Sequence, residues 1–285
     1  MDWNRTQTIF IVVFLVLDIF LAIQYFLKHE NNQFTVLEKS TFEEDMKTDQ
    51  ITYGGLSKKP KTGSSISAQK RIFKQSEISS LKGQKPLDLP KKEPLTEIEM
   101  TFEKPIPIKT DLETTAKEIV NNQVIDGSKY KLWKVDQLKN RVIFFQAYKG
   151  KFIFQDQKES ANNDMGEIVL FLNKNNEFVS YKQSMLQKIK EVKTENLISA
   201  VGAVEALYYH PDYLKPNSKI KNAELGYYTQ YPLASAQIFV PVWRIEVQRG
   251  TKEKDNLMYE EFIVDARDGA VLQSKDKKEN RSESS

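Results

Sequence analysis

The sequence predicts an α+β protein that follows an N-terminal transmembrane helix. Three observations support this class. A continuous apolar run occupies residues 9–27, and a helix pattern followed by several strand patterns then occurs twice, beginning near residues 110 and 194. The strand patterns are short and are joined by turn sequences, which is typical of antiparallel sheets with helices on one face. We therefore expect repeated modules, each consisting of a helix on an antiparallel sheet.

The apolar run has the length of a membrane span. At 1.5 Å per residue, residues 9–27 form a helix of roughly 28 Å, about the thickness of a bilayer's hydrocarbon core. A cleavable signal peptide is the alternative, but its apolar core has only about 7–15 residues and ends at small residues. Here bulky residues 24–27 lead into Lys28, and no A-x-A pattern follows. We predict an uncleaved anchor.

The flanking charges decide the orientation only weakly. Arg5 precedes the run and Lys28 and Lys39 follow it, so the positive-inside rule gives little preference. Residues 1–8 are too short to form a domain, and long downstream regions translocate largely regardless of charge. We expect a single-pass protein of the cell membrane with a cytoplasmic stub, residues 1–8, and an extracellular bulk.

The composition excludes several classes of function. The chain has no cysteine, which excludes disulfides, thiol catalysis and thiolate metal sites. Its 42 basic and 39 acidic residues give a net charge of only +3, so nothing favours nucleic acid as a partner.

A first extracellular domain is expected over residues 28–189. Ser40 and Glu43 have the spacing of a capping box, which predicts a short helix before a strand near 51–53. Residues 57–94 are rich in Lys, Ser, Gly and Pro, and we interpret them as a variable basic region, either a mobile loop or a poorly packed pair of strands. This region is either simply solvated or in contact with anionic wall polymers or lipid.

The first domain continues with a helix and a series of strands. A capping box from Thr110 to Glu113 opens the helix. Its apolar face consists of Leu112, Ala116, Ile119 and Val120. Strand patterns follow at 141–148, 151–154, 167–172 and 177–181, with a turn cluster at 173–176.

A second extracellular domain is expected over residues 190–274, followed by a disordered tail, 275–285. Thr194 is the predicted helix cap, and His210 before a proline ends the helix. In the strand at 241–247, apolar residues alternate with Arg244 and Glu246, which predicts one buried and one wet face. The remaining features are a helix face of Leu197, Ile198, Val201, Val204 and Tyr208, strands at 223–231 and 259–265, and a hairpin turn at Asp268 and Gly269 leading into 270–272.

The extracellular part carries no recognisable catalytic motif. The chain has two histidines, His29 and His210, too few for a histidine cluster, and His210 fits a structural role at a helix end. The acidic cluster from Asp265 to Asp268 lacks the register of a calcium loop, so we interpret it as a hairpin, with a weak cation site as the alternative. We expect no catalytic residue, no cofactor and no metal.

The most informative residue is Asp18, a carboxylate in the middle of the apolar run. Such a residue costs about 2.5–3.5 kcal/mol on insertion scales and usually faces a partner or a cavity. A 4-3-4-3 spacing places it in one seam with four other residues, and Ala22 allows a second backbone to approach. Either Asp18 hydrogen-bonds a partner helix, or it is protonated and carried by its apolar neighbours. The predicted partner-binding seam is Ile11, Leu15, Asp18, Ala22 and Tyr25.

The amino-terminal sequence also resembles a known family. Residues 1–11 (MDWNRTQTIFI) and 17–21 (LDIFL) closely resemble the start of the YycI (WalI) family of Gram-positive bacteria. Chain length, the single anchor, the lack of cysteine and the downstream layout also fit, whereas residues 57–94 add little support.

The resemblance implies a membrane-anchored accessory protein of the WalK/WalR (YycG/YycF) two-component system, which governs cell-wall homeostasis. It implies the sensor histidine kinase WalK (YycG) and the sister protein YycH as partners, with a YycH-like extracellular fold and no enzyme activity. It also implies contact between the transmembrane helix and the kinase's membrane helices, which we assign to Asp18. Residues 242–247 and 261–272 resemble more loosely the strand pair of PepSY-type modules.

The leading hypothesis is therefore a regulator that acts on a sensor kinase by contact. The alternative is an extracytoplasmic module that binds peptide, lipid or wall polymer, or that restrains a peptidase. The two differ in the membrane helix, because a binding module would retain its function when that helix is replaced by an unrelated one.

Overall fold

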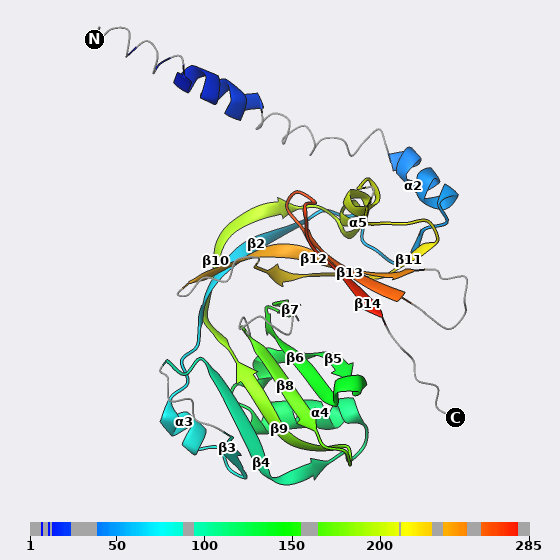
Figure 1. Ribbon diagram of the computed structural model, residues 1–285. Coiled ribbons are helices and arrows are strands. Elements are labelled where there is room, and N and C mark those ends of the chain that lie inside the picture. The colour runs from blue at the N-terminus through cyan, green and yellow to red at the C-terminus, as the bar shows by residue number, and fades with distance from the viewer. Residues whose placement is uncertain are drawn as a thin grey trace.

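A computed structural model of the chain describes residues 7, 11, 13–23, 39–87, 94–154, 165–210, 212–229, 236–249 and 258–278. These residues form two seven-stranded sheets and a few helices (Figure 1). The predicted α+β class is confirmed as a mixed fold in which sheet dominates. The repetition of one module along the chain stays a prediction.

The first sheet takes its strands from two distant parts of the chain. They are β1 (Thr52–Tyr53), β2 (Lys61–Lys70), β10 (Leu186–Leu197), β11 (Ser218–Tyr228), β12 (Gln237–Arg249), β13 (Met258–Asp265) and β14 (Val271–Lys278). The path is β1-β11-β12-β13-β14, and β2 pairs with both β12 and β10. Helices α2 (Lys39–Thr48) and α5 (Ala200–Tyr208) lie on one face (Figure 1).

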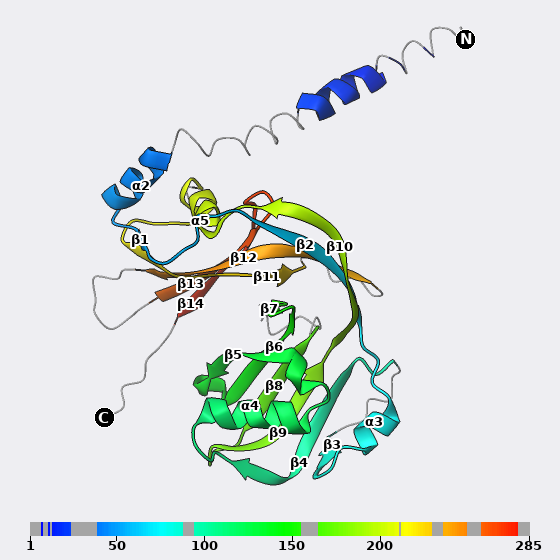
Figure 2. The same cartoon turned by 180° about the vertical axis from the view of Figure 1, so that it is seen from behind.

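The second sheet is formed by the intervening residues. Its strands are β3 (Gln84–Pro86), β4 (Glu97–Pro107), β5 (Tyr130–Asp136), β6 (Arg141–Tyr148), β7 (Lys151–Phe152), β8 (Glu167–Leu172) and β9 (Glu177–Ser184). The order is β3-β4-β9-β8-β6-β5, and β7 pairs with β6. Helix α4 (Leu112–Gln123) covers one face, as the view from behind shows (Figure 2). The short helices are α3 (Gln75–Ser79), η1 (Gly127–Lys129) and η2 (Gln137–Lys139).

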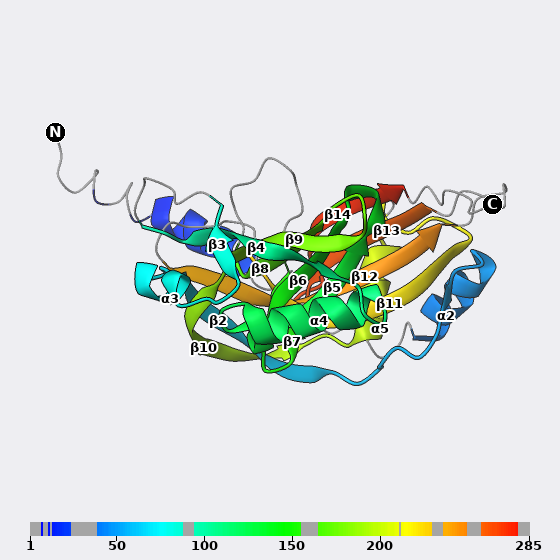
Figure 3. The same ribbon diagram turned by 90° about the horizontal axis from the view of Figure 1, so that it is seen from below.

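Three of the four apolar core clusters among the described residues order these elements into layers, and the fourth, which includes Ile66, Ile153 and Phe239, lies where β7 meets the first sheet. One core lies between α2, α5 and the first sheet, a second lies between α4 and the second sheet, and a third lies between the two sheets. Seen from below, α4 crosses the second sheet on its outer side (Figure 3). Leu207 and Trp243 belong to the core beneath α2 and α5, and Ile119 and Phe144 belong to the core beneath α4. Phe145 and Val242 belong to the core between the sheets. Strands β6 and β8 are apolar on both faces because each face lies against a different core.

The helices lie close to their predicted positions, but the three predicted caps are wrong. Helix α2 begins at Lys39, so Ser40 lies inside it rather than at its cap. Helix α4 is capped by Asp111, whose carboxylate accepts the N–H of Thr114 at 2.8 Å, rather than by Thr110.

Helix α5 is capped by Ser199 and not by Thr194. Thr194 belongs to β10, where its hydroxyl lies 2.8 Å from that of Ser64 in the neighbouring strand β2. Leu197, expected on the helix face that begins after Thr194, is the last residue of β10.

Strand β12 is buried on both faces, so its predicted wet face is wrong at Arg244. Only 6% of Arg244 is exposed. Its guanidinium lies 4.1 Å from the ring centroid of Trp133 in the second sheet and 2.8 Å from the carboxylate of Glu261. The second sheet therefore covers the face that alternation alone assigns to water.

The region 57–94 contains well-packed structure where we expected a loop or poorly packed strands. It contributes β2, α3 and β3, and Ile66 and Ala68 of β2 are fully buried. Residues 88–93 lie outside the described residues. The boundary expected between residues 189 and 190 falls within β10, and β14 extends to Lys278. The division into two extracellular domains stays a prediction.

Candidate functional site

The predicted transmembrane seam falls partly within the described residues. Residues 11 and 13–23 are helical, so Ile11, Leu15, Asp18 and Ala22 share one helix face. Tyr25 lies outside the described residues, as do residues 9, 10, 12 and 24–27 of the expected anchor. Among the residues that the structure describes, no helix has the length and hydropathy required to cross a membrane.

The helix of residues 13–23 is apolar on every side except at Asp18. Asp18 is its single charged residue and is exposed. The other exposed large side chains of this region are Ile11, Val13, Phe14, Leu15, Val16, Leu17, Ile19, Phe20, Leu21 and Ile23. A helix that is apolar all round normally lies in a protein core or in a membrane.

A second candidate site lies where the chain crosses between the two sheets. It leaves the first sheet after Lys70 and returns to it at Leu186, and these two residues pair in the β2–β10 ladder. The N–H of Arg71 donates to the carbonyl oxygen of Met185 at 2.8 Å, which holds the two crossings together. We call each sheet with its covering helices a lobe. The two crossings, with the side chains that contact them, are the lobe junction.

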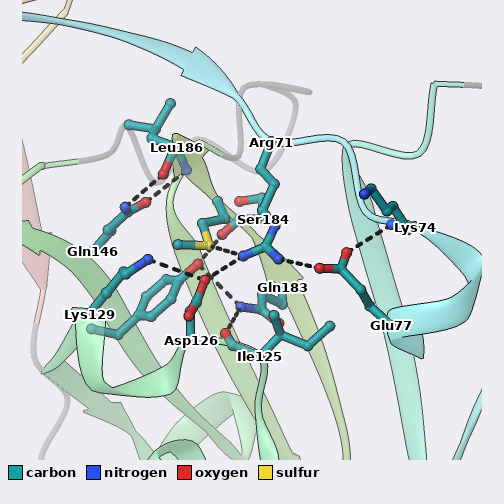
Figure 4. Close-up of polar contacts among 12 residues, drawn as sticks. Arg71, Lys74, Glu77, Ile125, Asp126, Lys129, Gln146, Gln183, Ser184 and Leu186 are labelled. Carbon is teal, nitrogen blue, oxygen red and sulfur yellow. Dashed lines mark hydrogen bonds and ion pairs between the residues drawn. The ribbon is translucent and has the colours of Figure 1, made fainter. Parts of the chain in front are cut away.

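Arg71 is the hub of the lobe junction (Figure 4). Its guanidinium forms ion pairs with Glu77, at 2.7 Å, and with Asp126, and it contacts the sulfur of Met185 at 3.2 Å. The Arg71 side chain is only 16% exposed, whereas the side chains of Glu77 and Asp126 are 35% and 37% exposed. One cation thus connects α3, the loop after α4 and the start of the return crossing.

Both carboxylates of this hub are held in their charged forms. A hydrogen bond from the backbone N–H of Lys74 is the main reason that the pKa of Glu77 lies below its usual value, and Arg71 adds to it. Burial alone would raise the pKa of Asp126, but hydrogen bonds from Lys129 and Arg71 outweigh it and lower the pKa. Neither group is therefore adjusted to exchange protons near neutral pH.

A buried polar chain continues from this hub beneath α4 (Figure 4). The phenol of Tyr130 donates to the carbonyl oxygen of Ser184 at 2.6 Å, and burial raises the pKa of this phenol. The side-chain amide of Gln183 donates to the carbonyl oxygen of Ile125 at 2.7 Å. These bonds attach the end of β9 to the segment that follows α4.

Gln146 fixes the other side of the return crossing. Its amide nitrogen donates to the carbonyl oxygen of Leu186 at 2.9 Å, and its amide oxygen accepts the N–H of Leu186 at 2.8 Å. Gln146 is only 1% exposed, and its side chain here replaces the backbone of a neighbouring strand. Gly166 has a φ of +83°, and a Cβ at this position would lie 2.8 Å from the Gln146 amide oxygen.

The two sheets meet at a second point through the segment after β7. Phe152 pairs with Ala147 of β6, and the next residue, Ile153, forms a parallel bridge with Tyr227 of β11. A Cβ at the preceding residue, Gly226, would lie 2.4 Å from the ring of Phe154. This close approach brings the second sheet's β7 segment directly against the first sheet.

The lobe junction is therefore suited to holding two lobes at a fixed orientation. Its cation pairs with two carboxylates, and the amides of Gln146 and Gln183 bond backbone groups of Leu186 and Ile125, which rigidifies the junction. The buried amide oxygen of Gln183 has no hydrogen-bond partner among the residues that the structure describes. In the described part of the chain, no group of three or more His, Asp or Glu side chains has an arrangement that could hold a metal ion.

Two other sequence predictions have clear outcomes. Helix α5 ends at Tyr208, two residues before His210, the predicted end, and the ring centroids of His210 and Tyr213 stack 4.1 Å apart. The predicted hairpin is confirmed, because Gly269 has a φ of +80° and β13 pairs with β14. The carboxylate of Asp265 binds the guanidinium of Arg267 rather than facing an open loop.

Sequence reasoning missed Arg71 and Gln146. Arg71 lies in the basic region 57–94, which we expected to be solvated or to contact anionic polymers or lipid, and its charge there resembles that of its lysine neighbours. Gln146 had a detectable signal, because it is an uncharged polar residue within an otherwise apolar strand pattern.

Comparison with known proteins identifies the family. The family model described as YycI protein matches residues 31–267. The chain belongs to the YycI family. YycI proteins are a regulatory family associated with the WalK/YycG system.

The other comparisons add little to this assignment. A comparison with curated proteins gave no match. One solved structure that resembles this YycI chain is an uncharacterized protein from Eubacterium rectale ATCC 33656, with 9% sequence identity and a TM-score of 0.46. The similarity covers 79% of this chain and 91% of that one.

Proposed function

We propose that this YycI chain is a membrane-anchored extracytoplasmic regulator of the sensor histidine kinase WalK (YycG). In this proposal residues 9–27 cross the cell membrane once, residues 1–8 are cytoplasmic, and the two-sheet body lies outside. The regulator acts together with YycH, and its output is cell-wall homeostasis signalling. The observation that carries the proposal is the family match over residues 31–267.

The N-terminal helix supports a role within the membrane. Its exposed side chains are apolar apart from Asp18, and Leu15 and Ala22 lie on the same face as Asp18. A hydrogen bond from a partner helix to Asp18 offsets part of the cost of placing a carboxyl group in hydrocarbon. The same contact gives the helix a preferred face for its partner.

A regulator of this kind shifts the kinase only through contacts that differ between the kinase's signalling states. The membrane seam supplies one set of contacts and the two-sheet body another. The lobe junction keeps the body in one arrangement, so its docking surfaces keep fixed relative positions. Catalysis by the regulator itself is not required.

The test is photo-crosslinking in living cells along the N-terminal helix. Probes at Leu15 and Ala22 report on the Asp18 face, and probes at Val13 and Phe20 report on the opposite face. We expect WalK to be captured from the Asp18 face only. Equal capture from both faces, or capture of no kinase from either, contradicts the proposal and moves the search to the binding-module alternative.

A substitution gives an independent measurement. Hydrogen bonds between membrane helices contribute roughly 0.6–2 kcal/mol, so we expect Asp18→Leu to weaken co-isolation of the kinase about 3- to 30-fold. Phe20→Leu is the matched control on the opposite face. Unchanged co-isolation of WalK with Asp18→Leu would argue strongly against the seam.

A further inference from the structure

Helix α2 is the first element of the two-sheet body after the N-terminal helix. Both views place α2 at one end of the first sheet, near α5 (Figures 1 and 2). It leads directly into β1, whose two residues pair in parallel with β11. A displacement of the N-terminal helix along the chain therefore reaches α2 before any other described element.

The attachment of α2 to the first sheet rests on few side chains. Phe42 and Met46 are 3% and 1% exposed, and they are the fully buried apolar residues among its described side chains. The ring of Phe42 lies 5.8 Å from that of Tyr208 on α5 and 6.3 Å from that of Tyr53 on β1. Phe42 is thus the central contact between α2 and its seat.

Among the described residues, the less exposed polar contacts between α2 and its surroundings lie at Asp49, just after its carboxyl end. The phenol of Tyr208 donates to the carboxylate of Asp49 at 2.9 Å, and the N–H of Asn217 donates to the carbonyl oxygen of Asp49 at 2.8 Å. The remaining ion pair, between Glu43 and Lys58, lies on the surface with both side chains at least half exposed. Such surface pairs contribute little.

Helix α2 cannot be stable without this seat. It has 10 residues, whereas isolated helices shorter than about 12–15 residues are marginal in water. Its helical structure therefore depends on docking Phe42 and Met46, and loss of docking implies loss of the helix. Phe42 and Met46 share one core with α5 and the long strands β11, β12 and β13, but most residues of that core come from α5 and these strands and also pack on one another.

We propose that α2 is a latch that docks and folds as one unit on α5 and β1, and that it releases without unfolding the sheets. The latch places a two-state element between the N-terminal helix and the two-sheet body. This inference rests on the proposed function for its purpose, because a regulator bound in the membrane needs a route to its extracytoplasmic surfaces. The separate opening of α2 itself does not depend on the proposed function.

Hydrogen exchange of the full chain in detergent micelles tests the latch. We expect the amides of α2 to exchange together and at least about 100-fold faster than those of β12, because local units open at a lower free energy than the global fold. Removing a buried phenylalanine side chain typically weakens such docking about 100-fold or more. Phe42→Ala should therefore bring α2 exchange close to that of an unstructured chain and leave β12 unchanged. Glu44→Ala, on the exposed face of α2, is the matched control.

A cross-link provides the converse test. The chain has no cysteine, so a thiol reagent reacts only at the introduced pair Glu43→Cys and Lys58→Cys. A short bifunctional thiol linker between these neighbours should slow α2 exchange at least about tenfold relative to the unlinked pair. If α2 of the unmodified chain exchanges as slowly as β12, or if the linker has no effect on α2, the latch is wrong.

These outcomes are separable from the proposed function. If Phe42→Ala also accelerates exchange of β12, then α2 is part of the global fold and the latch is refuted, whatever the kinase results are. If α2 opens as expected but the Asp18 face captures no kinase, the latch stands and the proposed function fails.

Discussion

Replacing Gln146 with methionine tests the lobe junction at a fully buried polar contact. Methionine retains most of the side-chain volume but can neither donate to the carbonyl oxygen of Leu186 nor accept its N–H. The two bonds that are lost measure 2.9 and 2.8 Å, and Gln146 is 1% exposed. The substitution therefore leaves two backbone groups of Leu186 without these partners.

The expected cost follows from these two groups. An unsatisfied buried polar group costs about 1–3 kcal/mol, so the loss of two partners should lower the free energy of unfolding by roughly 2–6 kcal/mol. A change of 1 kcal/mol shifts the midpoint of thermal unfolding by about 2–4 °C in proteins of about 150–250 residues. We therefore expect Tm to fall by roughly 4–24 °C. Tryptophan fluorescence follows the transition, because Trp133 lies between the sheets and Trp243 lies beneath α5.

A second substitution separates hydrogen bonding from packing. Gln146→Glu has nearly the same shape, and its protonated form can both donate to and accept from Leu186, whereas its carboxylate can only accept. Burial should raise the pKa of this carboxyl group in the folded state. The folded state then binds more protons than the unfolded state above pH about 4.3, so stability should fall as the pH rises through this range.

The reasoning is refuted by either of two results. One is a loss of less than about 1 kcal/mol for Gln146→Met, which would show that Leu186 does not depend on the amide. The other is a Gln146→Glu protein whose stability relative to the unmodified chain does not change between pH 4 and pH 7.

Three further predictions address other parts of the fold. Gly127→Ala should cost roughly 3 kcal/mol or more, because a Cβ there would lie 1.7 Å from the carbonyl oxygen of Val120, whereas Gly54→Ala, with open space, should cost less than about 1 kcal/mol in chemical denaturation. Burial raises the pKa of Glu224, which means that the folded state disfavours its charged form. Glu224→Gln should therefore increase the free energy of unfolding at pH 7, and denaturation curves below pH about 4 should show no such increase. Burial and the carboxylate of Asp49 raise the pKa of Tyr208 to about 12. At pH 7 Tyr208→Phe should therefore speed amide exchange in α2, and the difference from the unmodified chain should shrink as the pH rises from about 10 to 12.

The local elements could be predicted where one pattern controlled them. The spacing of Ala116, Ile119 and Val120 indicated the buried face of α4, and all three are buried in the second core. The strands at 141–148 and 167–172 coincide with β6 and β8. Both strands are continuous apolar runs, and such runs form under nearly any arrangement that buries them.

The pairing of distant segments could not be predicted, because no local pattern encodes it. Strand β2 contains three serines and is central only because β10 and β12 flank it. Alternation shows that Arg244 points away from the core covered by α5, so we expected it to face solvent. Alternation does not show that the second sheet covers that opposite face. Arg71 likewise gains its partners Glu77 and Asp126 only once the chain has crossed between the sheets.

The same contacts indicate where this regulator can change shape. Relative motion of the lobes would have to disrupt the apolar core between the sheets, the lobe junction and the bridge at Ile153. Release of α2 disrupts mainly the seat of Phe42 and Met46 and the bonds to Asp49. Because local opening follows the lowest free-energy route, a conformational response of the body should begin at α2 rather than between the lobes. The two-sheet body then serves as a fixed platform, and α2 is the element through which that platform is coupled to the N-terminal helix.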